Sequence, residues 1–399
     1  MNYLKDKKVR NAIMIGTLCS VSYLAVYLAR NVLGAVSPQM IESGSSETFI
    51  GSASSVYFIF YAIGQLINGA IGDKIKARNM ISFGLILAGI TNLLFPYIMK
   101  FSDSAIFVYG MTGFFLSMIY GPMTKVVAEN TEPVYATRCS LGYTFASFFG
   151  SPLAGALATV MAWGAVFTLS SVVLFVMGTV CFFVFLMFEK RGIVKYHQYD
   201  RPKEDKSGGI KLLIKHRIIK FTFISILTGV IRTTVVFWMP TYVSQYLGFA
   251  SEKATAIFTA ATLVISTTTF IAVFVYEKLG RNMDLTILLS FAVSSVSFLL
   301  VYILKQPMLN IIFMVVGIMA NNSAATMLWS RYCPSLRDTG MVSGATGFLD
   351  FVSYMAASLS STVFANAVGS IGWGNLILVW FGLMVLGIIT SLPRRQKQN

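Results

Sequence analysis

Two long stretches of this chain contain no charged residue, and they limit what the chain can fold into. One runs from Ser140 to Phe188 and the other from Phe351 to Pro393. A helix needs about 20 apolar residues to cross a bilayer, so each stretch is long enough for two crossings. The whole chain is 56% hydrophobic and 12% charged, with a mean hydropathy of +0.71, which excludes an ordinary soluble domain. The sequence therefore predicts an all-α protein that crosses a membrane many times.

Hydropathy and helical periodicity predict twelve transmembrane helices. We expect them at about residues 11–37, 49–72, 79–99, 104–127, 137–161, 164–188, 218–247, 253–276, 283–304, 307–330, 340–367 and 370–392. An even number of spans puts both termini on one side. The only basic residues in the outer loops of this arrangement are Lys100, Lys253 and Lys305, while nearly all other lysines and arginines fall on the opposite side. The positive-inside rule then predicts cytoplasmic termini and a location in the inner or plasma membrane of a cell.

A polar segment divides the chain into two predicted six-helix bundles. Residues 1–188 form the first bundle, residues 189–217 a cytoplasmic linker of mixed charge, and residues 218–399 the second bundle. The net charge of +15 follows from this topology, because basic residues gather on the cytoplasmic face and meet anionic lipid there. We therefore expect the lipid bilayer as a partner, no nucleic acid, and a monomeric protein.

Signatures of metal, cofactor and catalytic sites are missing from the sequence. The four cysteines, at positions 19, 139, 181 and 333, are dispersed among apolar segments without metal-ligand spacing. No nucleophile and base stand at a recognisable spacing, and no glycine loop of the phosphate-binding type is present. The sequence thus predicts no metal, no cofactor and no enzymatic activity.

Arg30 and Arg232 are isolated charges in apolar segments. Arg30 is the only charged residue between positions 10 and 42, and Arg232 is the only one between positions 220 and 252. Each stands eight positions before a proline, which indicates an internal duplication. A guanidinium at bilayer depth costs roughly 3 kcal/mol, so its presence indicates a function. Because its fork matches a phosphate or a carboxylate, the pair predicts an anion site shared by two pseudosymmetric halves.

A loop motif follows the second predicted helix. Gly69, Asp73, Lys74 and Arg78 form the pattern G-x-x-x-D-K-x-x-x-R, the signature loop of the major facilitator superfamily. An aspartate near a helix end can pair with an arginine and hold one conformation on the cytoplasmic side. We therefore expect Asp73 and Arg78 to take part in gating.

The second half contains a degenerate copy of this loop. Glu277 and Arg281 stand at the corresponding place, and the acidic residue follows the isolated arginine by 43 positions in the first half and by 45 in the second. Arg138 and Arg337 form a further pair, 108 and 105 positions after the isolated arginines. Coincident offsets of this kind support an internal repeat, and these four residues join the predicted gating set.

Over nearly its whole length the chain resembles the organophosphate:phosphate antiporter family of the major facilitator superfamily. Besides the loop motif, the resemblance is carried by Tyr23, Tyr27, Arg30, Asn31, Ile231, Arg232, Trp238, Pro240, Thr241 and Tyr242. It implies two six-helix bundles and exchange of an organic phosphate for inorganic phosphate by alternating access. It also implies that the two arginines hold the phosphate group near the bilayer midplane. Tyr23 and Tyr27 suit this site because positions 23, 27 and 30 share a helical face.

Two positions depart from that family. Gln65 stands where the glycerol-phosphate members carry a lysine, and Ala146 stands where they carry a histidine. Tyr61 and Gln65 share a helical face, which fits either substrate binding or hydrogen bonding between helices. Lys125 near the end of the fourth predicted helix could attract anions, or it could extend to the lipid headgroups.

Asp350 is the only acidic residue deep in a predicted span. It could couple transport to protons or act in gating, and it could instead be the counterion of Arg232. The first possibility leaves open a proton-coupled transporter of a carboxylate or another organic anion. A membrane sensor of sugar phosphates is a third possibility, because a sensor could use the same pocket.

Overall fold

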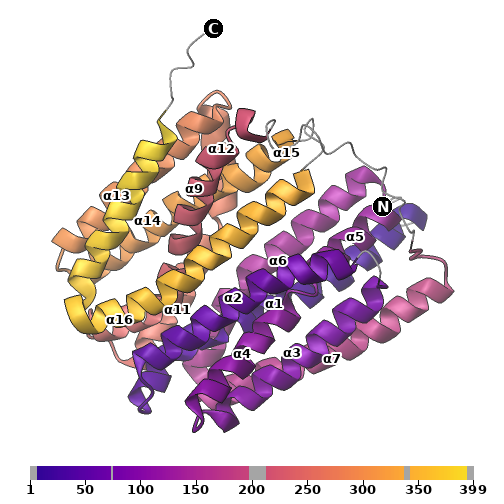
Figure 1. The fold of residues 1–399 in the computed structure, drawn as a ribbon, viewed down its shortest axis with the longest axis horizontal. Helices are drawn as coiled ribbons and strands as arrows, with labels where there is room; N and C mark the ends of the chain where they lie inside the picture. Colours follow the sequence, from indigo (N-terminus) through magenta and orange to yellow (C-terminus); the bar gives the residue numbers. More distant parts are fainter. Residues whose placement is uncertain (1–6, 73–74, 197–212, 337–341, 393–399) are drawn as a thin grey trace. The chain divides into compact units, whose positions relative to one another are not determined.

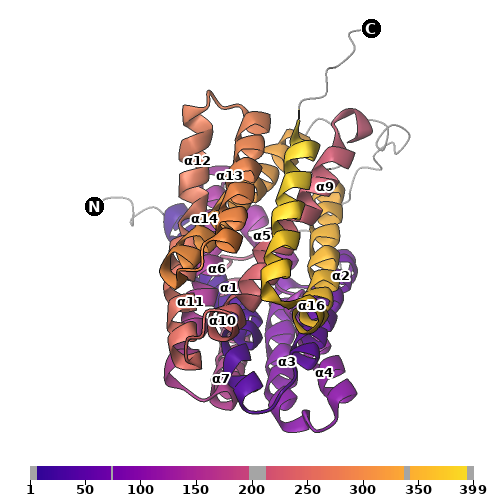
Figure 2. The same ribbon diagram turned by 90° about the vertical axis from the view of Figure 1, so that its left-hand side faces the viewer.

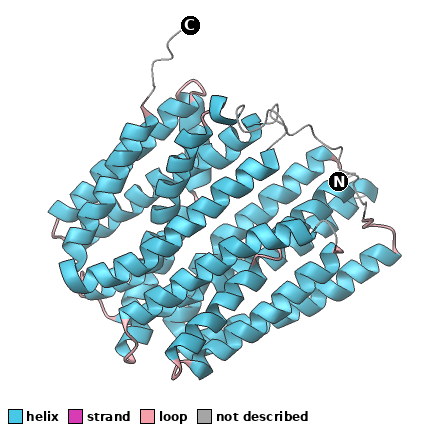
Figure 3. Cartoon of the chain, viewed as in Figure 1, coloured by secondary structure: helices cyan, strands magenta, loops and turns pink. Residues whose placement is uncertain are grey.

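The computed structural model describes residues 7–72, 75–196, 213–336 and 342–392, and every regular element in these ranges is a helix (Figure 3). No strand occurs in this described part of the chain. Helices satisfy their own backbone hydrogen bonds, which is what a membrane interior demands. The predicted all-α class is confirmed.

The helices follow one another in the order labelled in Figure 1. Before the linker these are α1 (Lys7–Glu42), α2 (Glu47–Gly72), α3 (Ala77–Ile98), α4 (Ser102–Leu116), α5 (Tyr120–Asn130), α6 (Pro133–Val160) and α7 (Trp163–Lys190). After it come α9 (Ile218–Gly229), the π-helical turn η2 (Val230–Val235), α10 (Val236–Gln245), α11 (Ser251–Ser266), α12 (Thr268–Lys278), α13 (Met283–Ile303), α14 (Pro307–Met327), the π-helical turn η3 (Leu328–Tyr332), α15 (Cys333–Ser335) and α16 (Val342–Ser391).

Ten helical stretches in the described part of the chain are long and apolar enough to cross a membrane. The longest, Gly347–Ser391, is two helices joined at Gly372, whose φ of 76° lies in the left-handed region that glycine tolerates. The apolar stretch Phe145–Val160 of α6 supplies a further crossing. Counting the longest stretch twice and adding α6 gives the twelve predicted spans, so the predicted fold class is confirmed.

Two predicted spans are interrupted. The fourth predicted helix is α4 and α5 with a short turn between them, and the predicted span 253–276 is α11 and α12. At the second interruption, the hydroxyls of Thr267 and Thr268 donate to the carbonyls of Val264 and Ile265 at 2.7 and 2.6 Å. Such bonds compete with the helical ladder and bend a helix, which hydropathy alone does not reveal.

The chain divides into two compact units. The first comprises Met1–Arg201 with Ala250–Leu263, and the second comprises Pro202–Phe249 with Val264–Asn399. Most of α11 therefore packs within the first unit: the Ser251 hydroxyl donates to the Glu42 carboxylate, and a Cβ on Gly155 would lie 3.1 Å from the Phe258 ring. The boundaries predicted from the sequence for the bundles and the linker stay a prediction.

Each unit contains a close pair of parallel helices in almost the same register. In the first unit α1 packs on α6, with Gly16 beside Cys139 and Tyr27 beside Gly150, so 139 − 16 and 150 − 27 both give an offset of 123. In the second unit α9 packs on α16, where Ser225 contacts Leu349 and Gly229 contacts Ser353 (Figure 1). Here 349 − 225 and 353 − 229 both give 124. The offset between the paired helices is thus nearly the same in the two units, as an internal repeat predicts.

Other helix pairs are joined by buried polar side chains. In the first unit α3 lies beside α7, where the amide nitrogen of Asn92 donates to the hydroxyls of Ser170 and Ser171 at 2.9 and 2.8 Å. In the second unit α14 lies beside α12 and α13 (Figure 2). There the Ser294 hydroxyl donates to the Gly317 carbonyl at 2.8 Å. Contacts of this kind hold helices together where both water and a hydrophobic driving force are missing.

Candidate functional site

Aromatic rings surround Arg30 on α1. Its guanidinium carbon lies 5.2 Å from the centre of the Tyr27 ring, 5.5 Å from Phe58 and 5.1 Å from Tyr61. We call Tyr27, Phe58 and Tyr61 the aromatic cage. A cation over a ring gains roughly 1 to 2 kcal/mol when partly desolvated. In a cation–π contact a ring attracts the guanidinium by its face, whereas an anion binds the N–H groups at the guanidinium edge, so the two kinds of interaction are compatible.

A tyrosine cluster lies beside the cage. The Tyr23 ring centre is 4.9 Å from that of Tyr27, 5.5 Å from that of Tyr120 on α5 and 6.1 Å from that of Tyr143 on α6. Tyr23 is buried and Tyr27 is half-buried. The structure therefore brings the predicted residues Tyr23 and Tyr27 together with Arg30. It adds Tyr120 and Tyr143, which the sequence did not single out because aromatic residues are common in membrane helices.

The face of α2 that contains Tyr61 and Gln65 has two different environments. Tyr61 is buried against Arg30, and Gln65 one turn later is half-buried. Asn68 donates to the Ser117 hydroxyl of the neighbouring span at 2.7 Å. At Asn68 the contacts fit hydrogen bonding between helices, while Tyr61 lies where it could help to hold a ligand of Arg30.

One turn before Arg30, α1 and α6 touch through their backbones. A Cβ on Gly150 would lie 2.6 Å from the carbonyl carbon of Tyr27 and 2.7 Å from its oxygen, so only glycine fits. Beside this contact is a shallow apolar depression of about 300 Å³ lined by Ser20, Val21, Leu24, Gly142, Phe145, Ala146 and Phe149. The family's histidine position, Ala146, therefore lies on an apolar wall between α1 and α6.

Arg232 is the third residue of the π-helical turn η2. A π turn holds an extra residue and shifts the backbone hydrogen bonds to i−5, and such turns occur frequently at functional sites. The Arg232 side chain is half-buried, and it makes no ion pair or hydrogen bond with the described residues. One turn earlier, a Cβ on Gly229 would lie 2.8 Å from the carbonyl oxygen of Ser353. Each isolated arginine thus follows a glycine-mediated helix contact by one turn.

Asp350 is half-buried on α16, next to Leu349, whose carbonyl accepts a hydrogen bond from Ser225 at 2.7 Å. The offset of 124 between α9 and α16 places Arg232 level with position 356, six residues beyond Asp350. At 1.5 Å per residue, the two Cα atoms are about 9 Å apart along the helix axes. This separation fits a long-range influence on Arg232 better than a direct ion pair.

Arg78 belongs to a half-buried polar cluster at the end of α7. Its Nη1 lies 3.0 Å from Glu189 Oε2, and the Tyr196 hydroxyl donates to the other Glu189 oxygen at 3.1 Å. Burial, followed by the charge of Glu189, raises the pKa of Tyr196 and keeps its hydroxyl protonated as a donor. The sequence indicated Arg78 but not Glu189 or Tyr196, because neither stands near the loop motif.

The other predicted gating residues are dispersed. Lys125 is half-buried on α5, and Arg138 is exposed near the start of α6. Glu277 and Arg281 are exposed around the end of α12, where Arg281 adopts a left-handed φ of 60°. Two predicted gating residues lie outside the described residues, namely Asp73 and Arg337.

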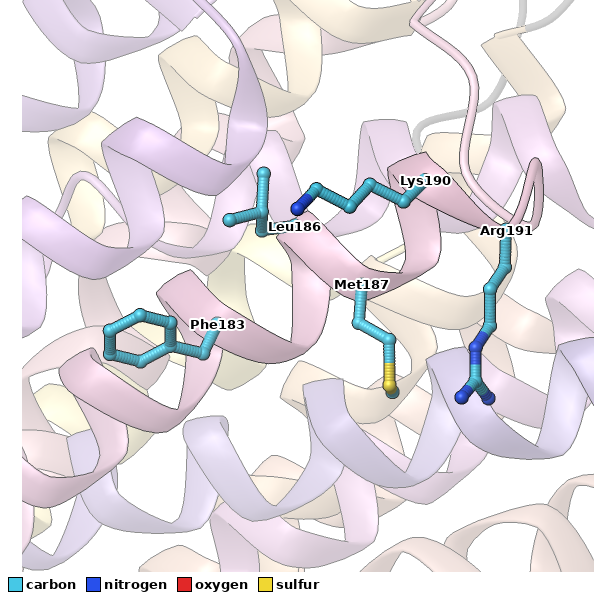
Figure 4. A pocket seen from close by; sticks show the side chains of 5 residues that line it. All are labelled: Phe183, Leu186, Met187, Lys190 and Arg191. Atoms are coloured by element: carbon cyan, nitrogen blue, oxygen red, sulfur yellow. The ribbon is translucent and has the colours of Figure 1, made fainter.

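A second depression, of about 310 Å³, lies along the last turns of α7 (Figure 4). It is lined by Phe183, Leu186, Met187, Lys190 and Arg191. Apolar side chains followed by basic ones are typical of a helix that leaves the hydrocarbon for the headgroup region. None of the predicted site residues lines it.

Comparison with known proteins gives relatives of two kinds. The family model described as Major Facilitator Superfamily matches residues 19–360. The chain is 24% identical over 274 residues to a glycerol-3-phosphate transporter of Bacillus subtilis (strain 168), which covers 62% of this chain and 60% of that protein. It is 28% identical over 78 residues to the membrane sensor protein UhpC of Salmonella typhimurium, which covers 19% of this chain and 18% of that protein. The chain therefore spans less than two thirds of either relative.

A solved structure has the same fold. The xylose transporter XylE from E. coli, in a partially occluded inward open conformation, matches with a TM-score of 0.73 and 14% identity. The match covers 98% of this chain and 100% of that one. At this identity the likeness shows a shared fold alone.

Proposed function

Because the chain belongs to the Major Facilitator Superfamily, a family of membrane transporters and not of enzymes, we propose that it is a secondary transporter of an organic anion. The preferred substrate is a phosphorylated metabolite that is exchanged for inorganic phosphate. In this proposal both termini are cytoplasmic and the protein spans the cell membrane, as the placement of lysine and arginine predicts.

The observation that carries the proposal is the half-buried Arg232 in a membrane span, without an ion pair among the described residues. An arginine in such a place is costly unless it meets an anion. Arg30 stands at the matching position in the first half, inside its aromatic cage. The likeness to a glycerol-3-phosphate transporter supports a phosphate-bearing anion.

Exchange of one anion for another is expected from the charges of Arg30 and Arg232. A site with two arginines binds an anion well and changes conformation poorly when empty, so one anion leaves as another enters. Purified protein in proteoliposomes should therefore take up radiolabelled phosphate only when the vesicles contain phosphate or an organophosphate. Unlabelled organophosphates should inhibit this uptake more strongly than dicarboxylates do. Equal uptake into empty vesicles under a pH gradient would favour a proton symporter instead.

The variant Asp350→Asn distinguishes an electrostatic role of the Asp350 carboxylate from a role in proton coupling. A negative charge on the neighbouring helix repels a bound anion, by roughly 1 kcal/mol at about 15 Å and an effective dielectric constant of 20. Neutralising Asp350 should therefore strengthen anion binding up to about tenfold, both in phosphate counterflow and in gradient-driven uptake. A variant that keeps normal counterflow and loses its response to a pH gradient would instead assign proton coupling to Asp350.

A sensor of sugar phosphates is a second candidate function, favoured by the likeness to the membrane sensor protein UhpC. A sensor and an exchanger can share the same anion site. Saturable phosphate binding by the purified protein without uptake into loaded vesicles would favour the sensor.

A further inference from the structure

The outer face of α7 is apolar along its length and ends in two basic residues. The exposed side chains Val172, Val176, Val180, Phe183 and Met187 follow one another at intervals of three or four positions, which places them on one face of the helix. Other faces of α7 pack on α3 and α1. In a membrane span a continuous exposed apolar face is directed at lipid acyl chains. The exposed residues Lys190 and Arg191 follow where this face ends.

The depression of about 310 Å³ lies at this junction (Figure 4). Figure 4 shows the Lys190 side chain pointing back towards Leu186 and the Arg191 side chain beside that of Met187. Its apolar part and its basic part match the two parts of a phospholipid, an acyl chain and a headgroup phosphate. Since ligand pockets measure roughly 300 to 1,000 Å³, this volume suits a headgroup with the first part of one acyl chain.

The charges of Lys190 and Arg191 are not neutralised by the described residues. Neither side chain forms an ion pair or a hydrogen bond there. The adjacent carboxylate, Glu189, is already engaged by Arg78 at 3.0 Å and by the Tyr196 hydroxyl at 3.1 Å. Its negative charge is therefore balanced by Arg78 and opposes an incoming anion only weakly. Two neighbouring cations at the level of the headgroups attract a group with a net negative charge.

The backbone at this helix end also favours an anion. Gly192 adopts a φ of 66°, which lets the chain turn back on the helix. The N–H groups of residues 191–193 then donate to the carbonyls of residues 187–189 at 2.8 to 3.1 Å. Carbonyls at a helix end carry partial negative charge and repel anions when they have no partner. Here three of them are hydrogen bonded, so this repulsion is reduced.

The end of α12 shows that an apolar face followed by a cation is not sufficient for such a site. There the exposed Phe274 is followed by Lys278, whose amino nitrogen lies 5.6 Å from the centre of the Phe274 ring. Glu277 stands beside it, exposed and without an ion pair among the described residues. Its negative charge offsets that of Lys278. The end of α7 differs because its carboxylate is balanced by Arg78.

We propose that this depression binds one anionic phospholipid. The headgroup phosphate lies between Lys190 and Arg191, and an acyl chain lies against Phe183 and Met187. A guanidinium can hold two phosphate oxygens through parallel hydrogen bonds, and an ammonium adds a point charge. In the orientation proposed above, the site faces the cytoplasmic leaflet, where anionic lipids are concentrated. The proposal does not depend on which substrate is transported.

Native mass spectrometry of the purified full-length protein in detergent tests the site. Phosphatidylglycerol and phosphatidylcholine with the same acyl chains differ in net charge, and titration with each gives the affinity of the first bound lipid. Since one basic residue near an anionic lipid changes affinity by about fivefold, phosphatidylglycerol should bind at least about tenfold more tightly. The double variant Lys190→Gln with Arg191→Gln should reduce this preference to within about twofold.

The matched control is the double variant Lys215→Gln with Lys278→Gln. It removes two exposed lysines from the second unit, so the net charge changes equally, and it should keep the wild-type preference. Equal binding of the two lipids by the wild type, or an unchanged preference in the Lys190 and Arg191 variant, overturns the site. An equal loss in both double variants replaces it with a diffuse attraction to the basic face.

A large excess of inorganic phosphate separates a lipid site from a site for a free anion. Bound phosphatidylglycerol should stay on the wild-type protein, because the contacts with Phe183 and Met187 have no counterpart in inorganic phosphate. Displacement by phosphate overturns the lipid assignment. Failure of the proposed exchange activity looks different, since it removes phosphate uptake into loaded vesicles and leaves the lipid preference as it is.

Discussion

Arg232→Lys is expected to weaken anion binding about a hundredfold while the protein still folds and inserts into a membrane. Lysine keeps the charge but lacks the planar fork, so it cannot hold a phosphate or a carboxylate through two parallel hydrogen bonds. A charged hydrogen bond contributes about 1.5 to 3 kcal/mol, and 2.8 kcal/mol corresponds to about a hundredfold. Arg30→Lys should have a similar effect and should also weaken the contacts with the aromatic cage. Calorimetric titration of each purified variant with inorganic phosphate measures the loss.

Arg217→Lys provides the control for these two variants. Arg217 lies at the start of α9, where its guanidinium forms an ion pair with Asp284 at 2.9 Å and its side chain is 47% exposed. Because a lysine can keep an exposed ion pair, this change should leave phosphate affinity within about twofold. Near-normal affinity in either Arg30→Lys or Arg232→Lys would remove the arginine-based anion site from the proposal.

Gly150→Leu and Gly229→Leu are expected to cost about 3 kcal/mol each and to lower the melting temperature sharply. A Cβ at Gly150 would lie 2.6 Å from the Tyr27 backbone, and one at Gly229 would lie 2.8 Å from the Ser353 carbonyl oxygen. Backbone atoms cannot rotate away as a flexible side chain can, so the helices must separate. Separation one turn before each arginine should also displace the arginine and reduce transport. Thermal unfolding in detergent, read by tryptophan fluorescence, measures the loss of stability.

Gly164→Leu and Gly382→Leu serve as controls because a Cβ at either position meets nothing within 4 Å. Gly164 lies in α7 of the first unit, and Gly382 lies in α16 of the second. Replacing a helical glycine in open space removes backbone freedom from the unfolded chain, so these variants should be neutral or slightly stabilised. Equal destabilisation of all four variants would contradict the assignment of close helix contacts to Gly150 and Gly229.

Much of the fold could be predicted from the sequence, because hydropathy depends on composition within a span and not on contacts between spans. Hydropathy and helical periodicity along the chain predicted the twelve spans, with the two uncharged stretches and the runs around Arg30 and Arg232 as the clearest signals. The interruption at Thr267 and the π-helical turn at Arg232 were not predicted. Both depend on a local exchange of backbone hydrogen-bond partners, which leaves no periodic signal.

The candidate site could be predicted only in part. A lone arginine in an apolar run is visible in a sequence, and so are tyrosines at helical spacing from it. Phe58 was not foreseen, because the contact that places its ring beside Arg30 joins two different helices. The roles of Tyr23, Tyr27, Tyr61, Gln65 and the gating residues stay predictions.

The interruption between α11 and α12 has a mechanical consequence. The two compact units meet along the chain between Leu263 and Val264, inside one membrane span, and the helical ladder of that span is broken at Thr267. Bending of this span is therefore concentrated within about one turn of Thr267, because an intact helix resists bending more than an interrupted one. The hydrogen bonds from the Thr267 and Thr268 hydroxyls to backbone carbonyls thus mark the point at which this span bends most easily.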